Sequence, residues 1–340
     1  MRIGLTGGAS SVDKMIRQAE QAEADGFTSL WYASVVGGDP LVPMAIAGRA
    51  TERIELGTGI AVAFARSPMT LANTAYDLQA YSGGRLLLGL GSQIKAHITK
   101  RFSMPWSHPA PRMREFILAM RAIWDAWDTG DKLDFRGDFY QHTLMTPFFN
   151  PGPNPHGQPK VFLAAVGRLM TEVAGETADG ILCHGFTTES YLREVTVPAL
   201  ERGLAKRDRT LADGGFQLSL PAFVVTGTTE EEVARSAKGV REQIAFYGST
   251  PAYRGVLEHH GWGDLQTELN ALSKQGAWVA MGELVDDDIL DAFAVQGPPD
   301  QIAPQLHDRF GGLIDRVSFY APYKSAPDTW LPIIESLKAG

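Results

Sequence analysis

Short apolar runs alternate with amphipathic stretches along most of the chain. The first run reads RIGLTG, and in the stretch that follows it Val12, Met15, Ile16 and Ala19 recur at helical spacing. Each later apolar run has the length of a buried strand, and most are followed by a helical pattern. The predicted strands are 2–7, 29–34, a run that begins at 54, 85–91, 160–165, 180–185, a run within 216–227, and 316–322. The predicted helices between and after them are 10–26, 39–51, 67–82, 168–177, 188–208, 229–247 and 299–310.

This alternation predicts parallel strands that are covered by helices. Eight strands that alternate with helices predict an α/β fold, a (β/α)8 TIM barrel, and an open doubly wound sheet is the alternative. Two stretches exceed a minimal barrel: 92–158 after the fourth strand and 248–297 after the seventh. Because neither has an alternating core pattern of its own, we interpret both as insertions into a single domain, 1–340.

The third strand contains an unusual pair of glycines. It lies in IELGTGIAVAFARSP, where Gly57 and Gly59 flank Thr58. Glycine inside a strand weakens it, through lost packing and through greater freedom of the unfolded chain. Two readings remain open from the residues alone: a tightly packed barrel strand, or a bulge that brings the backbone close to a ligand.

Composition limits the class of protein further. The net charge of −8 argues against a general nucleic-acid binder, which would show a basic face. Cys183 is the only cysteine, so no intrachain disulfide can form. The first residues lack the apolar segment of a signal peptide, and no run approaches the about 18 apolar residues of a membrane span. We therefore expect a soluble, cytoplasmic protein with no nucleic-acid or membrane partner.

The carboxyl ends of the strands are where a barrel carries its site. The sequence has no G-x-S-x-G elbow, no phosphate-binding loop that ends in GK[ST], and no H-E-x-x-H helix. The histidines lack metal-ligand spacing, so no metal is expected. One loop is informative. Val166, Gly167 and Arg168 lie between the fifth strand and a helix, where backbone N–H groups and the helix dipole favour an anion.

Four long segments together resemble one known family. They are AEADGFTSLWYAS with DPLVPMAIAGRATERIELGTGI, RSPMTLANTAYDLQAYSGGRLLLGLG, PKVFLAAVGRLMTEVAGETADGILCHG, and GPPDQIAPQLHDRFGGLIDRVSFY. In this order and spacing they resemble the luciferase-like monooxygenase superfamily, and more closely its branch that depends on the deazaflavin coenzyme F420. The resemblance covers nearly the whole chain.

The resemblance implies a cofactor site. It implies a bulge on the third strand, with a non-proline cis peptide between Gly59 and Ile60, against which the tricyclic ring rests. The residues it implies for binding the ring are Gly59, Ile60, Ala61 and Val62 at the bulge, with Gly91, Ser92 and Gln93 at the polar edge of the ring. The residues it implies for the phosphate are Ala165, Val166, Gly167, Arg168, His184 and Thr187.

The chain departs from the family where acid–base groups are expected. Ala33 and Ser34 replace the acid and the histidine after the second strand, and Ile94 stands near the place of a glutamate. General acid–base help must then come from elsewhere. The first candidate is His97, followed by Ser34 and Tyr32. The aromatic side chains Trp31, Phe64 and Trp106 suit an apolar substrate pocket, or simply the core.

The resemblance therefore implies an F420-dependent oxidoreductase, which transfers hydride between C5 of the deazaflavin and a small organic substrate. The substrate is expected to be apolar or of the carbonyl or alcohol type. One alternative is a luciferase-like monooxygenase that uses reduced FMN and oxygen. Another is a deazaflavin-binding protein without catalysis, which the missing acid–base pair leaves open. Family members often form homodimers, and we expect a homodimer here.

Overall fold

The computed structural model describes residues 1–8, 11–34 and 38–339. The chain divides into two compact units. The larger contains Leu5–Leu182 and Ala199–Gln217, and the smaller contains Met1–Gly4, Cys183–Pro198 and Leu218–Gly340. The single domain 1–340 stays a prediction.

The strands are β1 (Arg2–Gly7), β2 (Ser29–Tyr32), β3 (Glu55–Thr58), β4 (Ala61–Val62), β5 (Leu86–Gly91), β6 (Phe135–Arg136), β7 (Gln141–His142), β8 (Lys160–Ala165), β9 (Gly180–Cys183), β10 (Gln217–Val225), β11 (Ala294–Gln296) and β12 (Arg316–Tyr320). The α-helices are α1 (Val12–Ala24), α2 (Leu41–Ala50), α3 (Pro68–Tyr81), α4 (Pro109–Thr129), α5 (Arg168–Thr177), α6 (Glu189–Tyr191), α7 (Val197–Ala205), α8 (Glu230–Gly248), α9 (Arg254–His259), α10 (Gly263–Gln275), α11 (Trp278–Glu283), α12 (Asp287–Phe293), α13 (Pro299–Phe310) and α14 (Leu331–Ala339).

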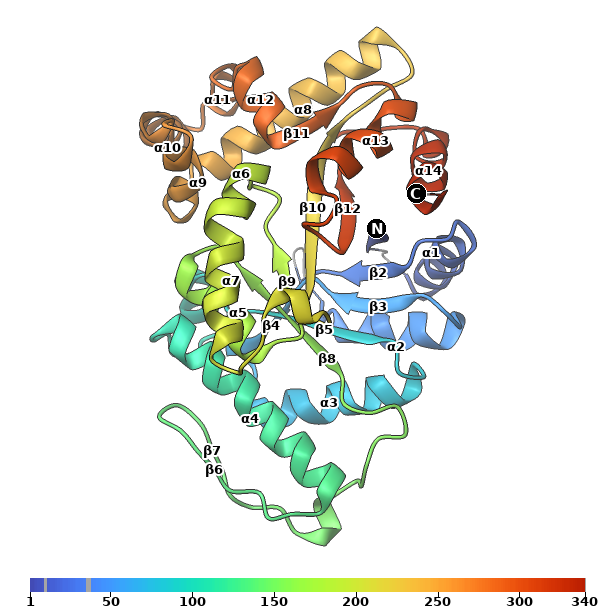
Figure 1. Cartoon of the computed structure of the whole chain (residues 1–340), viewed down its shortest axis with the longest axis vertical. Coiled ribbons are helices and arrows are strands. Elements are labelled where there is room, and N and C mark those ends of the chain that lie inside the picture. Colours follow the sequence, from blue (N-terminus) through green and yellow to red (C-terminus); the bar gives the residue numbers. More distant parts are fainter. Residues whose placement is uncertain (9–10, 35–37, 340) are drawn as a thin grey trace. The chain divides into compact units, whose positions relative to one another are not determined.

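The larger unit is built on a parallel sheet with the strand order β1-β2-β3-β5-β8-β9. The register pairs Trp31 with Gly57 across β2 and β3, and Leu87 with Lys160 across β5 and β8. Figure 1 shows α1 to α5 along this sheet, and each of these helices packs against the next. All carboxyl ends of the strands therefore lie at one edge, because the strands are parallel.

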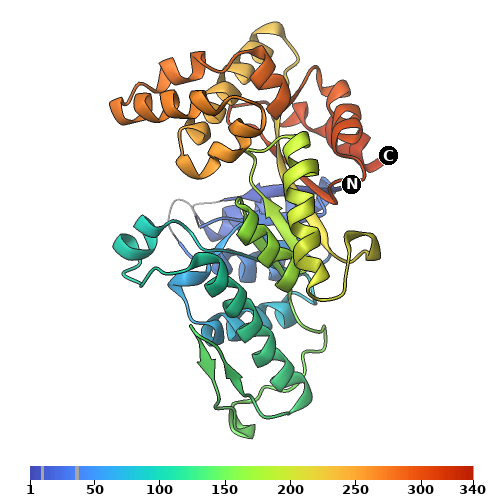
Figure 2. The ribbon, with the colours of Figure 1, turned by 60° about the vertical axis from the view of Figure 1, so that its left-hand side comes forward.

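The smaller unit holds a parallel sheet with the order β11-β10-β12-β1, to which the first residues of β1 belong. Helices α9 to α12, coloured orange in Figure 2, gather around α8. They share a core that includes Val256, Leu257 and Leu269. The insertion predicted at 248–297 is thus helical, but the sequence did not predict the short strand β11 at its end.

The insertion after β5 contains α4 and a hairpin of β6 and β7 that runs beside it (Figure 2). One carboxylate fixes the hairpin to the helix. Glu115 on α4 accepts hydrogen bonds from the backbone N–H groups of Asp138, Phe139 and Tyr140. Gly137 makes room for it, because a Cβ there would lie 2.2 Å from the Glu115 carboxyl group.

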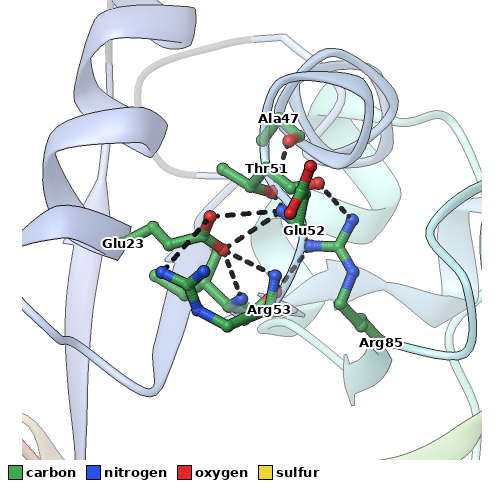
Figure 3. A network of polar contacts seen from close by, with 7 residues as sticks. Glu23, Ala47, Thr51, Glu52, Arg53 and Arg85 are labelled. Carbon is green, nitrogen blue, oxygen red and sulfur yellow. Dashed lines mark hydrogen bonds and ion pairs between the residues drawn. The ribbon is translucent and has the colours of Figure 1, made fainter.

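A second carboxylate, partly buried, joins α1 to the start of β3 (Figure 3). Glu23 accepts hydrogen bonds from the backbone N–H groups of Glu52, Arg53 and Ile54, at 2.6 to 3.2 Å. Arg85 meets the same turn from the other side and donates to the carbonyl oxygens of Thr51 and Ile54. These contacts satisfy backbone groups at the amino end of the sheet, away from the edge that carries the site.

The described residues contain neither a membrane-spanning helix nor a group of side chains suited to a metal ion. No helix there is long and apolar enough to cross a bilayer. No group of three His, Cys, Asp or Glu side chains lies in an arrangement that could hold a metal ion.

Candidate functional site

The floor of the candidate site is a small aromatic and aliphatic cluster in the larger unit. Trp31, Leu87 and Phe162 pack together with Leu182, and the Trp31 and Phe162 rings meet edge to face at 5.9 Å. Gly57 faces this cluster, because a Cβ there would lie 2.2 Å from the Trp31 ring. The first glycine of the pair in β3 therefore gives Trp31 its space, which is the packing reading of the sequence.

The second glycine of the pair opens the backbone instead. Gly59 follows β3 and is exposed, and a Cβ on it would meet only Trp31, at 3.9 Å. The peptide bond between Gly59 and Ile60 is cis, so the predicted non-proline cis peptide is confirmed. Ala61 and Val62 then resume pairing with β5 as β4. The ligand-approach reading therefore fits Gly59, while Gly57 follows the packing reading.

Two glycines on β5 let neighbouring groups pack closely against the strand. A Cβ at Gly89 would lie 1.8 Å from the carbonyl oxygen of Thr58, and a Cβ at Gly91 would lie 2.5 Å from Ile60 Cδ1. The carbonyl oxygen of Gly89 also accepts a 2.7 Å hydrogen bond from the Thr58 hydroxyl. Gly57, Gly89 and Gly91 therefore serve close packing, whereas the Cβ position of Gly59 has no neighbour closer than 3.9 Å. A flat ring could lie against the open backbone at Gly59 and Ile60, which we call the recess.

The loop after β5 supplies polar groups beside this recess. Ser92 and Gln93 are partly buried, and Gln93 has the left-handed backbone that non-glycine residues rarely adopt, with φ 59°. The Ser92 hydroxyl donates to the Gln93 carbonyl oxygen, and the Gln93 side-chain oxygen accepts from Ile94 N–H. His97 lies further along, exposed at the start of a π-helical turn that ends at Arg101. Its catalytic role stays a prediction.

The loop between β8 and α5 has the features of an anion site. Ala165 is buried and Val166 is partly buried. Gly167 is the N-cap and makes no side-chain cap, and Arg168 is exposed in the first helical turn. A Cβ at Gly167 would touch nothing within 4 Å, so a ligand could come close to the backbone. The N–H groups of a first helical turn have no partner within the helix, which suits a phosphate.

Tyr32 at the end of β2 carries an orphaned polar atom. Its hydroxyl is buried and has no hydrogen-bond partner among the residues that the structure describes, and burial raises its pKa to about 12. Its ring lies against Gly7, where a Cβ would be 2.7 Å from Tyr32 Cε1. Ala33 and Ser34 are partly buried next to it, and residues 35–37 lie outside the description. The catalytic role of Ser34 therefore stays a prediction.

We expect Tyr32→Phe to leave the stability of the protein at or slightly above the wild-type value, because the lost hydroxyl makes no bond to the described residues. Tyr76→Phe is the matched variant. Tyr76 donates to Asp128 and accepts from Asn154 N–H, so its loss is expected to cost about 1–3 kcal/mol. Thermal and urea unfolding of both variants test this. Equal losses of unfolding free energy in the two variants would contradict the absence of a hydrogen-bond partner for the Tyr32 hydroxyl among the described residues.

Two of the predicted pocket aromatics form a packed unit with an arginine. Phe64 is fully buried, meets Trp106 edge to face at 5.8 Å, and lies 4.4 Å below the Arg112 guanidinium. Arg112 also donates to the Tyr140 hydroxyl and to the Pro105 carbonyl oxygen. These contacts hold the loop before α4 in place and give Phe64 a packing role. A contact of Trp31, Phe64 or Trp106 with substrate stays a prediction.

The smaller unit contains the two remaining phosphate candidates. Thr187 is buried, and His184 follows β9. His184 Nδ1 accepts from the Phe186 N–H at 3.0 Å, and Nε2 lies 3.2 Å from the Tyr253 hydroxyl. Burial lowers the pKa of His184 to about 4, so its ring is neutral at pH 7. Both ring nitrogens are engaged, and phosphate binding by His184 and Thr187 stays a prediction.

Sequence reasoning missed the tyrosines that surround His184. Tyr247 and Tyr320 share a 2.5 Å hydrogen bond, and Tyr253 stacks on the His184 ring at 4.6 Å. Tyr320 ends β12, so the rule that sites lie at carboxyl ends of strands could have found it. Tyr247 lies on α8 and Tyr253 lies in the second insertion. No sequence pattern places either of them next to β9.

The sequence matches one protein family over most of its length. The model of the luciferase-like monooxygenase family matches residues 1–316, and the chain belongs to this family. Proteins of this family are oxidoreductases, including monooxygenases. This confirms the resemblance of the four segments in the sequence.

Individual relatives give more detail. An uncharacterized protein of Mycobacterium tuberculosis is 55% identical over 93% of this chain and 92% of its own. The 5,10-methylenetetrahydromethanopterin reductase of Archaeoglobus fulgidus is 26% identical over 84% of this chain and 83% of its own.

Solved structures support the fold. The coenzyme F420-dependent tetrahydromethanopterin reductase of Methanopyrus kandleri superposes with a TM-score of 0.78 and 20% identity, over 98% of this chain and 96% of its own. The 3,6-diketocamphane monooxygenase of Pseudomonas putida, in complex with FMN, superposes with a TM-score of 0.68 and 16% identity, over 99% and 96%. The predicted (β/α)8 barrel with insertions after the fourth and seventh barrel strands is confirmed.

Proposed function

We propose that the protein is a coenzyme F420-dependent oxidoreductase, which transfers hydride between C5 of the deazaflavin and a small organic substrate. The observation that carries the proposal is the open backbone after β3, where Gly59 is exposed and its Cβ position has no neighbour closer than 3.9 Å. Backbone without side chains suits the face of a flat tricyclic ring. The loop at Gly167 and Arg168, in the same unit, suits the phosphate of the coenzyme tail.

The residues of this chain would divide the work between binding and positioning. Gly59 and Ile60 would support the ring, and Ser92 and Gln93, which follow Gly91, would meet its polar edge with hydroxyl and amide groups. When bound, the reduced coenzyme supplies the hydride. The protein binds it, orients it and limits access of water. His97 and Ser34 are the proposed groups for proton transfer to or from the substrate.

The choice of F420 over FMN rests on relatives rather than on the recess. The solved structures similar to this chain include a coenzyme F420-dependent reductase and a monooxygenase in complex with FMN. The sequence relative at 26% identity is a methylenetetrahydromethanopterin reductase, which favours the deazaflavin. A luciferase-like monooxygenase that uses reduced FMN is the second candidate function, and both would use the same recess.

Equilibrium binding tests the proposal. Purified protein is titrated with oxidised F420 and with FMN, side by side, and binding is followed by the fluorescence of the coenzyme. We expect tighter binding of F420. A preference for FMN would favour the monooxygenase, and binding of neither would contradict the assignment of the recess and of the Gly167 loop. If F420 binds, a substrate screen with the reduced coenzyme distinguishes an enzyme from a binding protein.

A further inference from the structure

Three tyrosines and one histidine form a cluster in the smaller unit, which we call the tyrosine cluster. Its members are His184, Tyr247, Tyr253 and Tyr320. They come from the end of β9, from α8, from the turn Pro251–Tyr253 and from the end of β12. The His184 ring lies 4.6 Å from Tyr253 and 4.5 Å from Tyr247, and all four side chains are partly exposed.

The hydrogen bonds of His184 determine whether the Tyr253 hydroxyl donates or accepts in the bond between them. Because His184 Nδ1 accepts from a backbone N–H, the proton of the neutral ring is on Nε2. Nε2–H then donates to the Tyr253 hydroxyl oxygen, 3.2 Å away. The Tyr253 oxygen acts as the acceptor in this bond. Its own O–H therefore remains as a donor that this bond does not use.

The pair of Tyr247 and Tyr320 leaves a second donor. Their hydroxyl oxygens are 2.5 Å apart, so one O–H donates to the other oxygen. Either tyrosine can be the donor, and in both arrangements one O–H of the pair is not used in the bond between them. The tyrosine cluster thus offers two phenolic O–H donors next to aromatic ring faces. A buried or half-buried donor gains free energy when it finds an acceptor.

The charge of the tyrosine cluster selects the kind of acceptor. Burial raises the pKa of Tyr253 to about 12 and lowers that of His184 to about 4. Burial, with the hydrogen bond to Tyr247, also raises the pKa of Tyr320. His184, Tyr253 and Tyr320 are therefore uncharged at pH 7. Transfer of an anion into a partly desolvated site without a compensating charge is costly, whereas a neutral oxygen acceptor carries no such cost. A neutral ligand is therefore the alternative to the phosphate predicted for His184.

We propose that the tyrosine cluster binds a neutral carbonyl oxygen of the substrate through the O–H groups of Tyr253 and of the Tyr247–Tyr320 pair. The substrate class is then an aldehyde, ketone or amide with an apolar body that packs on the aromatic rings. The identification of this ligand as the substrate rests on the proposed function. The binding site itself is a property of the smaller unit.

The test uses the full-length protein without coenzyme and three probes: cyclohexanone, cyclohexanol and cyclohexanecarboxylate. Ligand-observed NMR titrations give their affinities. We expect cyclohexanone to bind more tightly than the carboxylate, and Tyr253→Phe to weaken cyclohexanone about tenfold, the value of one hydrogen bond. The double variant Tyr247→Phe, Tyr320→Phe removes the other donor independently, and should have a similar effect. Thermal unfolding by circular dichroism confirms that each variant is folded.

Tyr323→Phe is the matched control. Tyr323 is a half-buried tyrosine of the same unit, and its hydroxyl already donates to the Val224 carbonyl oxygen at 2.8 Å. Its loss should leave cyclohexanone affinity unchanged. The proposal is overturned if wild type does not bind cyclohexanone, if all variants bind it equally, or if the carboxylate binds more tightly.

A second titration separates the substrate from the coenzyme, which also carries carbonyl oxygens. F420 is titrated into wild type and Tyr253→Phe by fluorescence. We expect equal affinities. A tenfold loss of F420 affinity in the variant would assign the oxygen to the coenzyme and overturn the substrate assignment. Failure of wild type to bind F420 would contradict the proposed function. The cyclohexanone titration would still test whether the tyrosine cluster binds a carbonyl oxygen.

Discussion

Gly59→Val is expected to weaken coenzyme binding about 100-fold while the protein remains folded. A Cβ at Gly59 would have no neighbour closer than 3.9 Å, so the isolated protein can accommodate it. The added methyl groups would instead occupy the recess where we place the ring. Coenzyme affinity is measured by fluorescence titration, and stability by thermal unfolding.

Gly57→Ala is the matched variant for this prediction. A Cβ at Gly57 would lie 2.2 Å from the Trp31 ring, in the packed floor. We expect a loss of stability of about 1–3 kcal/mol, as for overpacked cores. The two glycines, two residues apart, should therefore separate ligand binding from folding. Normal coenzyme affinity in Gly59→Val would exclude the recess as the ring site.

Glu23→Ala is expected to lower the free energy of unfolding by about 2–3 kcal/mol. The carboxylate serves three consecutive backbone N–H groups, and its removal leaves them without that acceptor at the turn before β3. Glu20→Ala, which removes an exposed carboxylate of the same helix, should stay within about 0.5 kcal/mol of wild type. Urea unfolding at pH 7 measures both. Similar values for the two variants would contradict the stabilising role of the hydrogen bonds that Glu23 accepts.

The cost of Glu23→Ala should depend on pH. Burial alone would raise the pKa of Glu23, but the backbone N–H donors and Arg53 outweigh it, and the pKa is held below the ordinary 4.5. A carboxyl group with a lowered folded-state pKa stabilises the protein above its ordinary pKa. That contribution is lost as the pH falls through the folded-state value. The difference between wild type and Glu23→Ala should therefore shrink below about pH 4.5 and stay constant from pH 6 to 8.

Much of the fold could be predicted because it depends on local patterns. Apolar runs with helical stretches between them gave all eight barrel strands in order, and the two insertions. The strand β11 was missed because Ala294–Gln296 is only three residues long. It pairs with β10 through backbone hydrogen bonds, which leave little mark on side-chain composition. The hairpin of β6 and β7 was missed for the same reason.

The candidate site was predictable where it depends on glycines and on strand ends. Gly59 and Gly167 stand where the backbone is open, since a Cβ at either position would have no neighbour closer than 3.9 Å. The tyrosine cluster was not predictable, since Tyr247 and Tyr253 reach His184 only through the packing of α8 and the second insertion. Arg112 was missed as well, because its role depends on the loop that carries Trp106.

The sequence by itself determined the order of strands and helices, the membership of the family, and the positions where side chains are absent. These are set by the residues themselves and by their immediate neighbours. Only the tertiary structure decided the protonation of His184, the orphaned hydroxyl of Tyr32 and the different roles of Gly57 and Gly59. Each of these depends on which atom of a distant residue lies within about 3–4 Å, because hydrogen bonds and steric contacts act only over that range.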